Sequence, residues 1–149
     1  MSANNFIALQ RAGLPLGMAL AVADAKDVRI AALRAACAAA IGGGFPSAAL
    51  GATHTYPMDA TSQTNLSGSV LASLLPGLAA DWTTPFWCAD AAGNWAFAPH
   101  SAAQIQQAGT DAKAWVVSCQ QKLAALIAQV AAIDPNTGTA EAVEAVLWA

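Results

Sequence analysis

The sequence has few charged residues and no cluster of basic ones. Only 10% of its 149 residues are charged, against about a quarter in an ordinary soluble domain. The six Lys and Arg residues are scattered, so no basic stripe is present to neutralise a phosphate backbone. Nucleic acid is therefore not expected as a partner. A hydrophobic content of 56% in turn excludes a disordered chain.

Cysteine is also scarce, and its spacing fits no metal or disulfide pattern. Cys37, Cys88 and Cys119 lie far apart, their number is odd, and no CxxC pair occurs. Such spacing is typical of neither a zinc site nor a disulfide framework. We expect three buried thiols and no bound metal.

The sequence offers little catalytic chemistry. His54 and His100 are the only imidazoles, and we expect the first within a hairpin and the second at the surface near a helix start. The motifs of metalloproteases, serine hydrolases and phosphate-binding loops are absent. Isolated acidic residues next to turns or caps are typical of solvated turn residues; they are Asp81, Asp90, Asp134 and Glu141. We predict a protein that is not an enzyme and has no cofactor.

Residues 1–23 are predicted to form an extended apolar arm. Gly13, Pro15 and Gly17 make this stretch a poor helix and a poor strand. The apolar run 12–23 is too short to span a bilayer, and we expect an uncleaved arm without membrane insertion. Exposed apolar side chains are costly in water, so we predict a partner-binding arm, with packing on its own domain as the equal alternative. Its candidate contact residues are Phe6, Ile7, Leu9, Leu14, Leu16, Met18 and Leu20.

Residues 24–149 are predicted to form one small α+β domain that is mainly helical. Apolar periodicity, turn residues and capping residues divide it into six elements. These are a helix over 24–41 ended by Gly42–Gly44, a hairpin over 45–58 with Gly51 near its turn, a helix capped by Asp59 and closed by Pro76, a hairpin over 86–98, a long helix over 101–133, and a short helix capped by Thr139.

The second hairpin is rich in aromatic residues. Phe86, Trp87, Trp95 and Phe97 can form cross-strand pairs, each contributing on the order of 0.5 to 1 kcal/mol beyond burial. Because bulky aliphatic residues are scarce, we expect the tryptophans to serve mainly as core. The alternative is a sugar-binding surface in which Trp87 and Trp95, together with Trp82, act as stacking platforms.

The long helix carries a heptad seam, a stripe of apolar residues spaced by four and three. Ala112 and Cys119 belong to this stripe, and its bulkier members are Val116, Leu123, Leu126, Val130 and Ile133. Such a repeat favours a self-associating coiled coil. The alternative is that the short last helix, with Val143 and Val146, folds back and fills the stripe within one chain.

The stretch Tyr56–Gly68 contains a polar motif that helix propensity does not explain. Its members are Asp59, Ser62, Gln63, Asn65, Leu66 and Gly68. With Trp82, Trp95 and the helix start at Pro99–Ile105, this motif resembles a bacteriophage tail domain of unknown function, over about Lys26–Trp148. The sequence departs from that family at Leu50-Gly51-Ala52, where an Asn-Gly turn is usual.

The resemblance implies a virion protein of a phage tail, synthesised in the bacterial cytoplasm. We expect a non-enzymatic tail-fibre or fibre-attachment subunit, a homotrimer that docks on other tail proteins through its arm. The alternatives are a tail-fibre assembly chaperone and a receptor-binding fibre tip that attaches to host surface glycan. For the polar motif residues Ser62, Gln63 and Asn65, we predict hydrogen bonds that tie their helix to the first hairpin, with ligand contact as the alternative.

Overall fold

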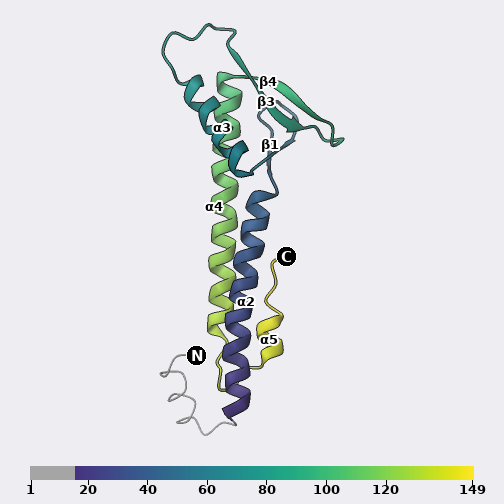
Figure 1. Ribbon diagram of the computed structural model, residues 1–149, viewed down its shortest axis with the longest axis vertical. Helices are drawn as coiled ribbons and strands as arrows, with labels where there is room; N and C mark the ends of the chain where they lie inside the picture. Colours follow the sequence, from purple (N-terminus) through teal and green to yellow (C-terminus); the bar gives the residue numbers. More distant parts are fainter. Residues whose placement is uncertain (1–15) are drawn as a thin grey trace. The chain divides into compact units, whose positions relative to one another are not determined.

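A computed structural model describes residues 16–149, and this part of the chain contains four helices and one four-stranded sheet (Figure 1). The expected α+β, mainly helical fold with one long C-terminal helix is confirmed. In chain order the elements are α2 (Leu16–Gly42), β1 (Phe45–Ser47), β2 (His54–Tyr56), α3 (Ala60–Ser73), β3 (Thr83–Ala89), β4 (Trp95–Ser101), α4 (Ala102–Ala132) and α5 (Ala140–Glu144).

The chain divides into two compact units. Among the described residues, the helical unit comprises residues 16–37 and Gln120–Ala149, and the sheet unit comprises Ala38–Cys119. The boundaries between the two units fall within α2 and α4.

Helix α2 begins at Leu16, eight residues before the predicted start. Leu, Met and Ala are strong helix formers, and one internal glycine costs only about 1 kcal/mol. Val22 is buried in the core of the helical unit, so packing also stabilises this turn. The extended arm is therefore wrong for residues 16–23.

Four residues of the predicted arm contact set, Phe6, Ile7, Leu9 and Leu14, lie outside the described residues. Leu16 opens α2, Met18 is exposed and Leu20 is half-buried.

The core of the helical unit contains most of the predicted heptad seam. Leu33 and Val130 are buried together with Val22 and Val143. Partly buried side chains of α2, of α4 and of the chain that follows α4 and α5 pack around them: Ala25, Ile30, Leu123, Leu126, Ile133, Val146 and Trp148. Side chains of α2 and of the C-terminal segment of the same chain thus pack against this part of the seam, as in the alternative expectation.

Helix α5 is capped as predicted, but it is shorter than expected. The Thr139 hydroxyl accepts a hydrogen bond from the Ala142 N–H at 3.1 Å. The helix ends at Glu144, so Val146 and Trp148 reach the core from irregular chain beyond it. The Lys122 ammonium lies 4.9 Å from the centre of the Trp148 ring and donates to the carbonyl of Ala149. These contacts hold the C-terminal segment against α4.

Both predicted hairpins are present, and they join into one antiparallel sheet of order β1-β2-β3-β4. The first turns near Gly51, and the second is longer than predicted because all seven residues of β3 pair with β4. Only one pair, Thr55 with Ala89, links the two hairpins. Most of the β3 edge that faces away from β4 therefore has no neighbouring strand.

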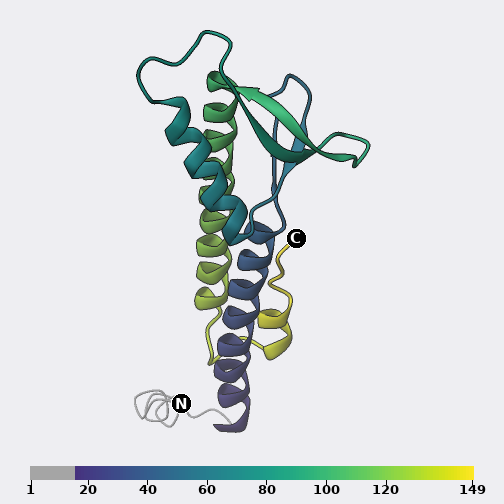
Figure 2. The same ribbon diagram turned by 45° about the horizontal axis from the view of Figure 1, so that its top comes forward.

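Helix α3 lies beside α4 in both views (Figures 1 and 2), and the Asp59 cap is confirmed. The Asp59 carboxylate accepts from the Ser62 N–H at 3.0 Å. The hydrogen-bonded Ser62 side chain and backbone lower the pKa of Asp59. Leu66 of α3 joins the buried core of the sheet unit, which comprises Phe45, Tyr56, Met58, Leu66, Phe86, Cys88, Ile105, Ala108 and Ala112.

Candidate functional site

The histidine expected at the surface lies in the core of the sheet unit. His100 is fully buried in β4, and its Nδ1 donates to the Ala98 carbonyl at 2.8 Å. That leaves Nε2 as an acceptor for the Tyr56 hydroxyl, also at 2.8 Å. The ring contacts Tyr56 and Phe86 edge-on. Both nitrogens are used inside the protein, so His100 is a structural residue.

The buried His100 predicts a loss of stability in mild acid. Burial lowers its pKa below the ordinary value of about 6.5. Between the two pKa values the unfolded chain binds the extra proton, so the free energy of unfolding falls as the pH drops below about 6.5, by at most about 1.4 kcal/mol per pH unit. Urea unfolding at pH 7.5, 6.0 and 5.0 measures this slope.

His100→Gln serves as the control for that slope, because glutamine does not titrate. The slope below pH 6.5 is expected to flatten in this variant. An unchanged slope in His100→Gln would contradict the attribution of this pH dependence to His100.

Three aromatic side chains form an exposed patch on the outer face of β3 and β4. Trp87, Trp95 and Phe97 are 40%, 44% and 69% exposed. Trp87 lies opposite Phe97 with ring centres 4.8 Å apart, and it stacks on Trp95 at 6.1 Å. The predicted cross-strand pairs are thus confirmed for these three. Phe86 lies on the buried face and stacks with Tyr56.

The expectation that tryptophans serve as core is right for part of the set. Trp82 and Trp115 pack against the core of the sheet unit and Trp148 against that of the helical unit. It is wrong for Trp87 and Trp95, because strand alternation places them on the face opposite Phe86 and Cys88.

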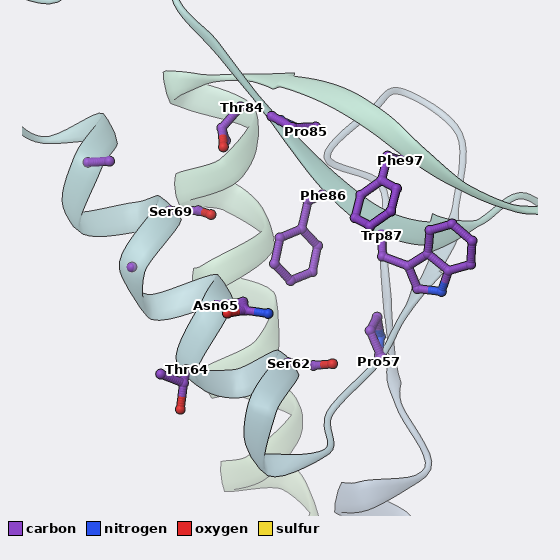
Figure 3. A pocket seen from close by; sticks show the side chains of 12 residues that line it. Pro57, Ser62, Thr64, Asn65, Ser69, Thr84, Pro85, Phe86, Trp87 and Phe97 are labelled. Carbon is purple, nitrogen blue, oxygen red and sulfur yellow. The ribbon is translucent and has the colours of Figure 1, made fainter.

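A surface groove of about 420 Å³, here called the α3–β3 groove, lies between α3 and the second hairpin (Figure 3). None of its lining side chains is ionisable. Its lining residues are Pro57, Ser62, Thr64, Asn65, Gly68, Ser69, Ala72, Thr84, Pro85, Phe86, Trp87 and Phe97. In Figure 3 the Asn65 and Ser69 side chains point from α3 toward Phe86. The groove can hold a ligand through hydroxyl, amide and aromatic groups.

The polar motif divides between structure and groove. Gln63 donates from Nε2 to the Met58 carbonyl at 2.7 Å, so the predicted tie between α3 and the end of the first hairpin is confirmed for this residue. The Ser62 hydroxyl donates to Asp59 at 2.6 Å instead. Ser62, Asn65 and Gly68 line the groove.

Val116, the remaining member of the predicted seam, lies in the sheet unit and packs against its core. It also lines a larger and mostly apolar groove of about 1130 Å³ between α3 and α4, together with Leu66, Val70 and Ala112. The five seam residues are therefore divided between two cores and form no continuous surface stripe.

Sequence reasoning did not find the groove. Thr84 and Pro85 were not singled out, although a proline inside a strand already indicates a strand edge without a partner. Residues 16–149 contain no group of three or more His, Cys, Asp or Glu side chains placed to hold a metal ion. Among the described helices, none combines the length and apolar character needed to cross a membrane.

Comparison with known proteins places the chain in a family without assigning an activity. The family model described as "Domain of unknown function (DUF4376)" matches residues 24–147. No curated protein and no solved structure matches the chain. Since the match covers most of the sequence, the chain belongs to the DUF4376 family.

Proposed function

We propose that this chain is a non-enzymatic structural subunit of a bacteriophage tail, in a tail fibre or at its attachment point. The observation that supports the proposal is the position of the phage-tail-like motif. Ser62, Asn65 and Gly68 line a surface groove beside exposed Trp87 and Phe97. Such a groove offers shape, hydrogen bonds and apolar contact, which are the means by which a subunit holds a neighbour.

The composition of the groove agrees with a binding role. General acid–base chemistry and nucleophilic catalysis by ionised groups need a titratable side chain at the site, and the lining residues contain no Asp, Glu, His, Lys, Arg or Cys. The neighbours in this proposal are other tail proteins and further copies of the chain, assembled as a homotrimer on the virion.

The first test asks where the protein is found. Phage particles purified on a density gradient from a host that carries the gene are analysed by mass spectrometry. The chain is expected among the tail proteins of intact particles. Its presence in the lysate and absence from particles would contradict the structural role and favour an assembly chaperone.

Receptor recognition is a second candidate function, and the exposed tryptophan pair favours it. Trp87 and Trp95 are stacked with their planes 19° apart and lie at the surface, so sugar rings could stack on them. Purified host surface polysaccharide is the probe. Trp95→Ala is expected to abolish binding if the pair is a sugar platform, and Leu74→Ala, at another exposed apolar position, serves as the control.

A further inference from the structure

The strand β3 has an open edge beside the α3–β3 groove. In an antiparallel pair, residues that hydrogen-bond across the pair alternate with residues that do not. The Asp90 N–H donates to the Asn94 carbonyl at 3.1 Å, so Asp90 hydrogen-bonds across the pair. By alternation, Cys88 and Phe86 also hydrogen-bond to β4, whereas Trp87 and Pro85 do not. The Trp87 N–H and C=O and the Pro85 C=O therefore point away from β4.

The two prolines of the hairpin agree with this assignment. Pro85 lies directly opposite Pro99, where neither residue needs an N–H for the ladder. The neighbouring strand β2 reaches β3 only at Ala89. The outward-pointing groups of Trp87 and Pro85 thus have no strand partner in this sheet.

The groove follows this open edge. Four consecutive residues of β3, Thr84–Trp87, line it, and α3 supplies the facing wall with Asn65 and Ser69 (Figure 3). A channel between a strand edge and a helix accepts an extended peptide, whose main chain pairs with the edge while alternate side chains enter the groove. The uncharged lining selects a segment without charged side chains.

We propose that the α3–β3 groove binds the segment Phe6–Gln10 of a second copy of this chain as an added β-strand. This segment lies outside the described residues, and it belongs to a stretch, residues 2–10, that has no charged side chain. Phe6-Ile7-Ala8-Leu9 joins an aromatic and a β-branched residue, which favour strands. Its five residues match the length of the edge Thr83–Trp87.

This inference rests on the proposed function, because it names the contact through which the subunit would self-associate. An arm of one copy in a groove of the next is a heterologous contact, and such contacts close into rings, a trimer included, or continue as a filament. The arm would also cover apolar side chains that are costly in water.

The decisive experiment combines two full-length variants by light scattering. Gly68→Phe fills the groove, because a side chain built at Gly68 meets no atom within 4 Å and the position lines the groove. Ile7→Pro removes an N–H from the arm and leaves the groove intact. Wild type is expected to form oligomers and each variant alone to be a monomer. Mixed in equal amounts, the variants are expected to form a dimer, since one intact arm then meets one intact groove.

Complementation keeps the test independent of misfolding, because a misfolded variant does not restore a dimer. Thr61→Phe, an exposed position on α3 that is not among the lining residues, is the control and is expected to keep the wild-type mass. A monomeric wild type, or a mixture that remains monomeric, would overturn the proposal.

A labelled synthetic peptide of residues 2–10 provides a second measurement. Binding of the peptide to full-length Ile7→Pro protein is expected to saturate. In the double variant that carries both Ile7→Pro and Gly68→Phe, the affinity for the peptide is expected to be at least about tenfold weaker. If the protein binds polysaccharide but not the peptide, and Gly68→Phe abolishes the polysaccharide binding, the groove is a glycan site and the proposal is overturned. If the peptide does not bind but the chain is present in purified tails, the groove proposal fails and the proposed function stands. Failure of one can therefore be distinguished from failure of the other.

Discussion

Replacing Leu33 with alanine is expected to lower the free energy of unfolding by about 3 kcal/mol. Leu33 is only 2% exposed and belongs to the cluster that contains Val130 and Val143. Its truncation removes apolar contacts and leaves a cavity. The helices and the C-terminal segment that surround this cavity are packed against one another, so they cannot move in far enough to close it completely. Urea denaturation followed by circular dichroism measures the change.

The matched control for Leu33 is on the same helix. Val28 of α2 is 70% exposed, so Val28→Ala is expected to change stability by no more than about 0.5 kcal/mol. The oligomeric mass is expected to stay the same in both variants, because the heptad seam packs within one chain. A Leu33→Ala protein of lower mass and wild-type stability would show that this seam is intermolecular.

Local features of the fold could be predicted because their causes are local. Asp59 and Thr139 cap α3 and α5 through hydrogen bonds that span three residues. The turn near Gly51 and the long periodic helix α4 likewise depend on neighbouring residues. Periodicity and capping chemistry therefore predicted the element types and most of their order.

Features that depend on distant residues could not be predicted. His100 looks like a cap-region residue in sequence, and only the fold brings it to Tyr56, which is 44 positions away. Helix α2 begins early because Val22 is covered by the helical unit. The heptad seam was visible, but periodicity does not distinguish a partner chain from α2 and the C-terminal segment of the same chain.

The candidate site was predicted only in its parts. The motif residues Ser62 and Asn65 and the exposed ring of Trp87 were each singled out, but the sequence does not show that they face one groove. Alternation indicates that a strand has two faces, and which face becomes buried depends on where α3 and α4 pack.

Replacing Gly44 with alanine is expected to cost about 3 kcal/mol, a loss comparable to that of Leu33→Ala. Gly44 links α2 to β1 with a φ of +105°, which residues with a side chain rarely adopt, and an added Cβ would lie 2.7 Å from the Tyr56 carbonyl oxygen. Because that oxygen belongs to the backbone of β2, relief would require separating β2 from the chain that leads into β1. Thermal and urea unfolding measure the loss.

The control for Gly44 is Gly42, two residues earlier at the end of α2. An added Cβ there meets no atom within 4 Å, so Gly42→Ala is expected to be neutral or stabilising by up to about 1 kcal/mol. Equal effects of the two substitutions would contradict the close approach of Gly44 to β2. The expected difference follows from the pairing of Phe45 with Tyr56, since the chain must pass beside Tyr56 to begin that pair. The same residue then carries the hydroxyl that reaches His100 of β4, so the conformation of Gly44 bears on both hairpins of the sheet.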